Sequence, residues 1–343
     1  MTADTASRPT LKDVAQRSGY SLRTVKKVMG QGEPVPEATR VAIETAAREL
    51  GYVKNILASA LSNGRRERIG LVYSAMTGAY FPEVEHGFSR FADEQRDYGL
   101  AVEFVTGDAT VEQQQATLER MLADDSITGV ILQPLSASRL APVIQRLSEA
   151  GKPVITFGSD APQSARLAYV GPNGYQAGRI GAEILAHYIG KHGRVLVVSR
   201  APEQMQTRDR RQGFADVLGE RFPQVAATDL ILGTADETSA ALREALAADD
   251  FSGIFFTYAD SAIGGSVLKD LGRRDVVLIG FDMSKETAAL MKQDYIQVIL
   301  EQNPEYFSYQ ALKMMFDLKY RNKVPQPVVT TEISVLTSEF LTP

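Results

Sequence analysis

The sequence predicts a small all-α head followed by a larger α/β body of two doubly wound parallel-sheet lobes. Two observations support this prediction. Three short helical segments fill the first 54 residues, and a glycine separates the first two. From residue 68 onward, short apolar runs typical of buried strands alternate with longer amphipathic segments, and the alternation occurs twice. Repeated βα units of this kind indicate parallel sheets with helices on both faces.

The stretch 10–29 contains the first two helices, joined by a turn at Gly19. Thr10 and Ser21 are expected to cap them, because their side-chain oxygens accept hydrogen bonds from free backbone N–H groups. Gly19 adopts a positive φ at little cost, which suits a tight turn. The second helix carries three basic side chains, Arg23, Lys26 and Lys27. This arrangement indicates a helix-turn-helix, which places its second helix in the DNA major groove; the alternative is a solvated surface hairpin.

A third helix is expected over residues 36–51. Pro36 suits its first turn, and Gly51 suits the position just beyond its end. Four apolar residues are expected on one face, covering the first two helices: Val41, Ala42, Ala46 and Leu50. A short apolar segment, residues 55–62, and a basic linker follow.

The composition is ordinary for a folded globular protein. The 343 residues are 44% hydrophobic and 23% charged, enough for two or three domains. There is no cysteine, which excludes disulfides and a thiolate nucleophile. Residues 1–10 lack the apolar core of a secretory signal, and no stretch has the length and apolarity of a membrane span. We therefore expect a cytoplasmic protein with no membrane partner.

Charge is divided unevenly between the head and the body. Residues 1–68 hold 12 Lys and Arg against 7 Asp and Glu, a net charge of +5. The rest of the chain holds 25 against 35, a net charge of −10. A basic head on an acidic body is typical of a DNA-binding module attached to a body with another role.

The body is expected to alternate strands and helices in chain order. Strands are expected at residues 69–73, 101–105, 129–132, 153–157, 168–170, 194–199, 229–232, 253–256 and 276–279. Helices are expected at residues 82–96, 111–123, 140–150, 174–190, 208–218, 237–247 and 262–271. In such folds, ligands bind in the crevice at the carboxyl ends of the strands.

The head carries a long series of residues in a characteristic order. They are Thr10-Leu-Lys-Asp-Val-Ala, Gly19, Ser21, Thr24-Val25, Thr39-Arg40, Leu50-Gly51-Tyr52, Asn55, Ala58 and Leu61. In this order and spacing the chain resembles the lactose-repressor (LacI) family of bacterial transcription regulators. It departs from the family pattern at four places: Lys26-Lys27, Gly30, Pro36 and Lys54. These departures concern the operator sequence and the hinge more than the fold.

The body resembles the sugar-binding unit that this family shares with type I periplasmic binding proteins. The matching segments are Tyr80-Phe81-Pro82-Glu83, Gly171–Gly178, Arg210–Phe214, Ala259–Gly264, Gly280-Phe-Asp282 and Gln302. The resemblance implies a DNA-binding domain at 1–54, a hinge helix and linker at 55–67, and an effector-binding and dimerisation domain at 68–343. It also implies a first lobe of about 68–167 and 303–330 and a second of about 168–298 and 331–343.

The resemblance implies a set of DNA-binding residues. Leu22, Arg23 and Lys27 are expected to reach base edges, and Ser21, Thr24, Tyr52 and Asn55 to hold phosphates. Ala58 and Leu61 belong to the hinge segment, where Leu61 is expected to wedge into the central base step. The alternative for Leu61 is an ordinary core leucine. Double-stranded operator DNA is therefore the expected partner, bound by a homodimer or a tetramer.

The resemblance also implies the effector-binding residues of the cleft. Arg210, Asp282 and Gln302 match polar positions that bind hydroxyls, and Tyr80 and Phe81 match aromatic positions that stack on a sugar. Three further candidates are Gln133, Asp160 and Tyr258. Structural alternatives remain open: Asp282 as a helix cap, Arg210 paired with Asp209 or Asp216, and Tyr80 and Phe81 as core. Departures at Gly78-Ala79, Gly158 and Ala259 widen the ligand range to polyols and non-sugar metabolites.

The sequence favours a ligand-responsive transcription regulator, expected to be a repressor. The three histidines, His86, His187 and His192, form no metal-ligand motif, and there is no phosphate-binding glycine loop or nucleophile elbow. No enzyme activity, metal or cofactor is therefore expected, although two carboxylates in one cleft are compatible with acid–base chemistry. A transport-type solute-binding protein is the other alternative, and the head argues against it. A regulator of the same fold that needs a corepressor also remains open.

Overall fold

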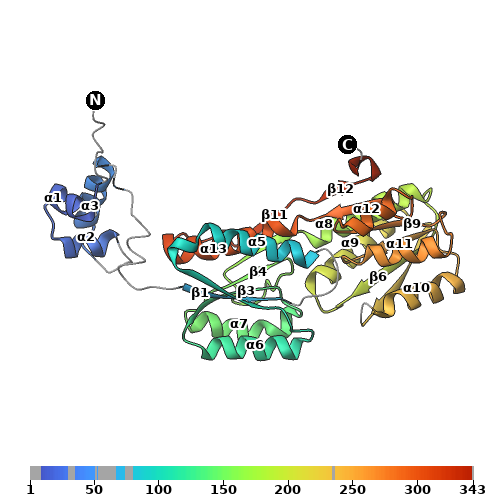
Figure 1. The fold of residues 1–343 in the computed structure, drawn as a ribbon, viewed down its shortest axis with the longest axis horizontal. Helices are drawn as coiled ribbons and strands as arrows, with labels where there is room; N and C mark the ends of the chain where they lie inside the picture. The colour runs from blue at the N-terminus through green and yellow to red at the C-terminus, as the bar shows by residue number, and fades with distance from the viewer. Residues whose placement is uncertain are drawn as a thin grey trace.

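A computed structural model describes residues 9–29, 35–50, 52, 67–73, 80–233 and 236–341. Three helices form the head: α1 (Leu11–Ser18), α2 (Leu22–Met29) and α3 (Glu37–Glu49). Two α/β lobes follow (Figure 1). The predicted hinge helix at 55–62 lies outside the described residues.

The head is built from local signals that the sequence carries. The main-chain N–H and the hydroxyl of Thr10 both donate to Asp13 Oδ2, at 2.6 and 2.7 Å. Gly19 ends α1 at a φ of 75°, and Ser21 Oγ accepts from the main-chain N–H of Thr24 at 3.1 Å. The predicted turn at Gly19 and the predicted cap at Ser21 are confirmed. Thr10 occupies the predicted N-cap position of α1, but its hydroxyl donates to Asp13 and does not accept from a main-chain N–H.

The head core joins one residue from each helix. Val14, Val25 and Ile43 are fully buried against one another. The sequence prediction for the third helix is wrong at Val41, which is 52% exposed. Ile43 takes the central position, because residues 43, 46 and 47 share the face that meets α1 and α2.

The first lobe holds a six-stranded sheet in the order β11-β5-β4-β3-β1-β2. Its strands are β1 (Glu67–Val72), β2 (Leu100–Val105), β3 (Ile127–Leu132), β4 (Val154–Phe157), β5 (Ala168–Pro172) and β11 (Val328–Thr331), all paired in parallel. Helices α5 (Tyr80–Glu94) and α13 (Pro304–Arg321) cover one face, and α6 (Val111–Ala123) and α7 (Ala137–Glu149) cover the other (Figure 1). A short 3₁₀ helix, η1 (Arg96–Tyr98), precedes β2.

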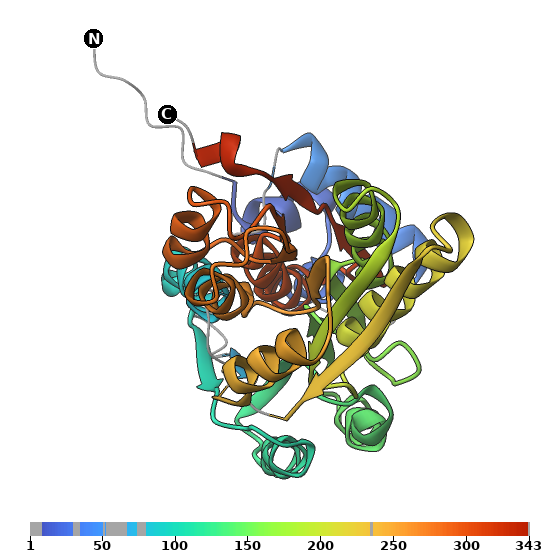
Figure 2. The same cartoon turned by 90° about the vertical axis from the view of Figure 1, so that its right-hand side faces the viewer.

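The second lobe repeats this architecture in the order β12-β10-β9-β8-β6-β7. Its strands are β6 (Gly193–Arg200), β7 (Val225–Leu232), β8 (Gly253–Phe256), β9 (Val277–Phe281), β10 (Val298–Glu301) and the antiparallel β12 (Ser334–Leu336). Its helices are α8 (Gly174–Tyr188), α9 (Met205–Arg221), α10 (Asp236–Ala248), α11 (Ser261–Asp270) and α12 (Lys285–Met291), followed by η2 (Ser338–Leu341). Figure 2 views this lobe end-on, with helices on both sides of the sheet.

The chain crosses between the two sheets three times. It crosses after β5, between β10 and α13, and between β11 and β12. The sequence placed the first crossing at residues 167–168, which is too early. β5 pairs with β4 and with β11, so it still belongs to the first sheet.

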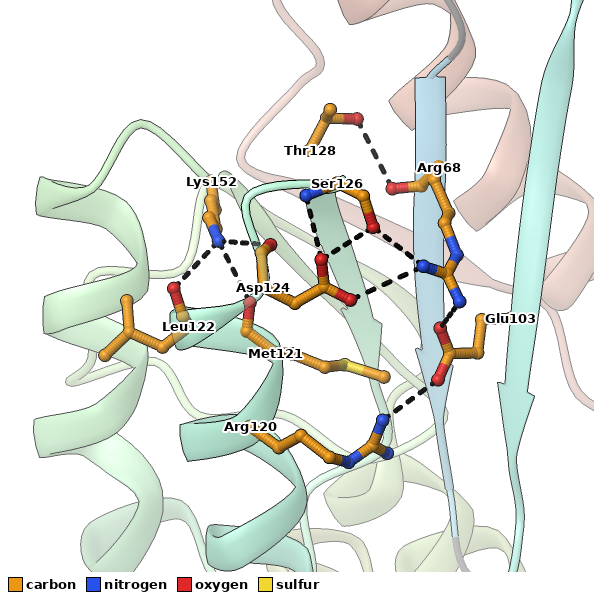
Figure 3. Close-up of polar contacts among 9 residues, drawn as sticks. All are labelled: Arg68, Glu103, Arg120, Met121, Leu122, Asp124, Ser126, Thr128 and Lys152. Atoms are coloured by element: carbon orange, nitrogen blue, oxygen red, sulfur yellow. Dashed lines mark hydrogen bonds and ion pairs between the residues drawn. The ribbon is translucent and has the colours of Figure 1, made fainter.

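A polar network fixes the start of β1, where the chain enters the first lobe (Figure 3). Arg68 forms ion pairs with Glu103 at 2.7 Å and Asp124 at 3.4 Å, and it donates to Ser126 Oγ at 2.7 Å. Buried Lys152 donates to the carbonyl oxygens of Met121, Leu122 and Asp124 at the end of α6. These contacts tie together the amino ends of β1, β3 and β4.

None of the described helices combines the length and the apolar character needed to cross a membrane.

Candidate functional site

A cavity of about 60 Å³ lies at the carboxyl ends of the strands, with walls from both lobes. The first lobe contributes Tyr80, Phe81, Gln133 and Gly158. The second contributes Arg200, Gln204, Gln206, Thr207, Arg210, Thr257, Tyr258, Ala259, Asp282 and Gln302. This is the position at which open α/β sheets bind ligands, because strand ends and helix starts leave polar groups there.

Arg210 is the central cation of the cavity. It lies on α9, is 4% exposed, and donates to the carbonyl oxygen of Thr257 and to Gln302 Oε1, both at 2.6 Å. Its guanidinium stacks on the ring of Phe281, 3.7 Å from the centroid. Burial lowers its pKa to about 10, so the group is charged at neutral pH. Among the described residues, no carboxylate lies within ion-pair distance of it, so neither of its predicted surface partners applies.

Asp282 follows β9 directly and adopts a φ of 62°, in the left-handed region. Both of its carboxylate oxygens accept from Gln302 Nε2, at 2.8 Å each. Burial, reinforced by the nearby charge of Glu301, raises its pKa to about 8. Gln302 therefore bridges Arg210 and Asp282, and the cation and the carboxyl do not touch.

The first lobe supplies an aromatic wall. Tyr80 and Phe81 begin α5 and contact each other edge-on, with ring centroids 4.9 Å apart. Gln133 Nε2 donates to the hydroxyl oxygen of Tyr80 at 2.8 Å. Burial raises the pKa of Tyr80 far above its ordinary value, so it keeps its proton. Such a wall fits the apolar face of a ring and one or two hydroxyls.

Asp160 is the one predicted effector residue that the structure does not bring to the cavity lining. Its carboxylate accepts from Arg166 Nε at 2.5 Å and Nη2 at 2.7 Å. It also accepts from Thr156 Oγ1 and from the main-chain N–H of Ala161, both at 2.7 Å. These four bonds saturate the group and give it a structural role in the loop after β4.

Seven lining residues were not nominated from the sequence: Gly158, Arg200, Gln204, Gln206, Thr207, Thr257 and Ala259. Arg200 ends β6, pairs with Asp260 at 2.5 Å, and lies over the Tyr258 ring at 4.7 Å. Burial raises the pKa of Tyr258 to about 12. The sequence did hold one indication of Arg200: like Asp282, it lies at the carboxyl end of a strand, where such folds bind ligands.

The head presents its predicted DNA-binding residues on α2 and beside it. Arg23 is exposed, and Leu22, Thr24 and Lys27 are half-buried. Ser21 Oγ is engaged in capping, at 2.8 Å from Thr24 Oγ1. Tyr52 packs against the head core, and burial raises its pKa. Asn55, Ala58 and Leu61 lie outside the described residues.

No group of three or more His, Asp or Glu side chains in the described ranges is placed to hold a metal ion. The cavity wall offers hydrogen-bonding side chains and aromatic rings. Such a lining is typical of pockets that bind small polar molecules.

A helix-turn-helix head joined to two lobes around a polar cavity defines a class of regulators that couple DNA binding to a small molecule. The profile described as bacterial regulatory proteins of the LacI family matches residues 10–55, and the profile of a periplasmic binding protein domain matches residues 69–322. The chain belongs to the LacI family of transcriptional regulators.

Individual relatives reflect both parts of the chain. The HTH-type transcriptional regulator CelR of Thermobifida fusca is 30% identical over 293 residues, covering 81% of this chain and 83% of the relative. The ribose import binding protein RbsB of Bacillus subtilis is 20% identical over 266 residues, covering 78% and 86%. These relatives are a regulator and a binding protein, and neither is named as an enzyme.

Solved structures agree on the fold of the body. The crystal structure of a putative LacI regulator from Bacteroides fragilis superposes with a TM-score of 0.76 at 20% identity, covering 81% of this chain and 99% of the other. GanP, a glucose-galactose binding protein from Geobacillus stearothermophilus, gives 0.71 at 23% identity, with 81% and 99% covered.

Proposed function

We propose that this regulator is a repressor whose hold on operator DNA is controlled by a small sugar or polyol bound between the lobes. The observation that carries the proposal is the cavity itself. Its hydrogen-bonded side chains Arg210, Gln302 and Asp282 lie close to the point where the polypeptide crosses between the lobes. The protein acts without catalysis, as a homodimer or a tetramer. Because its target is operator DNA, it works in the cytoplasm.

The head reads DNA through α2. Arg23 forms paired hydrogen bonds with guanine, while Leu22 and Lys27 contact neighbouring base edges. Ser21, Thr24, Tyr52 and Asn55 hold phosphates, which gives affinity but little sequence information. Ala58 and Leu61 form the hinge contact in the minor groove, where Leu61 kinks the central step. Two heads on one dimer match a near-palindromic operator.

The cleft controls the heads through the crossing between β10 and α13. Gln302 is followed at once by Asn303, which adopts a φ of 58° and caps α13. A ligand that takes over the bonds of Gln302 changes the preferred angle between the lobes. That change alters the separation of the two hinge segments, with a coupling free energy of about 1–3 kcal/mol.

DNA binding tests the function directly. The full chain is used to select duplexes from a random library, and affinity is then measured by fluorescence anisotropy. We expect Arg23→Ala to weaken binding to the selected duplex by about 1–3 kcal/mol and to relax the preference at one base pair. Arg48→Ala, at an exposed position of α3, is the matched control and should bind as wild type. Failure to select any sequence at moderate salt contradicts the proposal.

The same assay gives the sign of control. A sugar or polyol that raises the thermal transition of the full chain is added to the duplex titration. Release of DNA identifies an inducer, and tighter binding identifies a corepressor. A ligand that stabilises the chain and leaves DNA affinity unchanged contradicts the proposed coupling.

A further inference from the structure

Three residues that line the cavity carry buried nitrogen atoms without a hydrogen-bond partner among the described residues. They are Arg200 Nε, Gln206 Nε2 and Arg210 Nε. All three atoms are N–H donors. No buried side-chain oxygen of a described cavity-lining residue is unpartnered in the same way. The cavity therefore offers unmet donors and needs a ligand that brings acceptors.

The three donors come from one wall of the cleft. Gln206 and Arg210 are four residues apart on α9, so they share one face of that helix. Arg200 ends the neighbouring strand β6. Arg200 and Arg210 are 6% and 4% exposed, so bulk water does not reach their unpaired N–H groups.

The charges on this wall do not balance. The charge of Arg200 is met by Asp260 at 2.5 Å. Arg210 donates only to neutral oxygens, those of Thr257 and Gln302. The nearest carboxyl that acts on its charge, that of Asp282, is separated from it by Gln302. A buried guanidinium without a direct ion pair is unfavourable, and a bound anion lowers the penalty.

A hydroxyl brings a donor with its acceptors, whereas a carboxylate brings acceptors alone and pairs with a guanidinium fork. We propose that the effector is an acidic sugar derivative, an aldonic or uronic acid, whose carboxylate binds Arg200, Gln206 and Arg210. Its hydroxyl-bearing carbons then face Tyr80 and Phe81. This assignment rests on the ligand-responsive function proposed above and names its ligand class.

A phosphate ester offers the same acceptor-only oxygens, so the test separates the two sources. Binding to the full chain is measured by calorimetry and thermal shift at pH 7 and constant ionic strength. The probes are D-gluconate against D-glucitol, D-galacturonate against D-galactose, and D-glucose 6-phosphate. We expect at least one acid to bind with a Kd about tenfold or more below that of its neutral partner.

Two outcomes overturn the proposal that the ligand binds through a carboxylate. In the first, the phosphate ester binds and neither acid does; in the second, the neutral partners bind as tightly as the acids. A neutral sugar that binds and changes DNA affinity leaves the proposed function standing. An acid that binds without changing DNA affinity supports the ligand class and overturns the proposed function. Absence of binding by every probe overturns the ligand class.

Gln206→Glu supplies an anion from within the cavity. We expect the variant to lose stabilisation by the acid and to show a higher thermal transition than wild type when unliganded. Gln224→Glu makes the same charge change at an exposed position outside the cavity and should behave as wild type. A Gln206→Glu chain that still binds the acid with unchanged Kd overturns the proposal.

Discussion

Two buried cations of this protein, Lys152 and Arg210, differ in how fully their N–H groups are hydrogen-bonded. Lys152 is 8% exposed, and its ammonium group donates to three carbonyl oxygens at 2.8–3.0 Å (Figure 3). Arg210 is 4% exposed, yet it keeps one N–H without a partner and forms no ion pair with a carboxylate in the described part of the chain. A saturated cation holds structure together, and an unsaturated one is ready for a ligand.

The two cations also mark opposite ends of the sheets. Lys152 and Arg68 close the amino ends of the first-lobe strands, where the chain arrives from the head. Arg210 lies at the carboxyl ends, where two lobes meet. The comparison predicts that stability depends on the first end and ligand response on the second.

Lys152→Met is expected to produce the largest loss of stability. It removes three charge-assisted hydrogen bonds and leaves carbonyls at the end of α6 without their donor, at a cost of about 3 kcal/mol. Urea denaturation of the full chain measures the change. Lys323→Met, at an exposed position, is the control. A loss below about 1 kcal/mol would show that water replaces the ammonium group.

The pH dependence of stability is the next largest effect. The folded pKa of Asp282 is about 8 against an ordinary 3.8, so the folded chain binds a proton that the unfolded chain releases between these values. The free energy of unfolding should therefore fall as pH rises toward 8, by about 2 kcal/mol between pH 6 and pH 8. Glu83, whose pKa burial raises to about 7, acts in the same direction.

Asp282→Asn isolates this contribution, because the amide resembles the protonated carboxyl. The free energy of unfolding of the variant, obtained from urea denaturation at each pH, should change less between pH 6 and pH 8 than that of wild type. Asp275→Asn, an exposed site whose pKa is lowered by its hydrogen bonds with Arg273, is the control and should not flatten the curve. Identical curves for Asp282→Asn and wild type would contradict the raised pKa.

Arg210→Met should change stability far less than Lys152→Met. The substitution loses two hydrogen bonds but removes an unpaired buried charge, so we expect a change of about 1 kcal/mol or less. Calorimetry should show that any cleft ligand is lost. Arg208→Met, exposed on the same helix, should retain it. An Arg210→Met chain destabilised as much as Lys152→Met would remove the distinction between the two cations.

Local signals made most of the fold predictable. Capping at Thr10 and Ser21 depends on residues three positions away, and the alternation of strands and helices depends on short apolar runs. Val41 was misplaced because a helix with several small apolar residues has more than one plausible buried face. β5 was misassigned because strand pairing with β11 joins residues far apart in the sequence.

The candidate site was predictable where a side chain follows a strand or matches a family position. Asp282 and Arg210 were nominated in this way, and both line the cavity. Asp160 was nominated as a further candidate from the resemblance, but Arg166, six residues later, binds its carboxylate. Arg200 was missed because its partner Asp260 and its place on the wall appear only when two strands are brought together.

The smallest expected effect lies in the head, where cations are exposed rather than buried. Arg17 on α1 pairs with Glu49 on α3 at 2.8 Å, but the two side chains are 59% and 50% exposed. Water and salt screen such a pair, so Arg17→Gln should cost less than about 1 kcal/mol. Added salt should therefore lower the free energy of unfolding of wild type by more than that of the variant, and the difference should not exceed this amount. A double-mutant cycle with Glu49→Gln that gives a coupling comparable to the loss at Lys152 would show that exposure does not separate the head from the body.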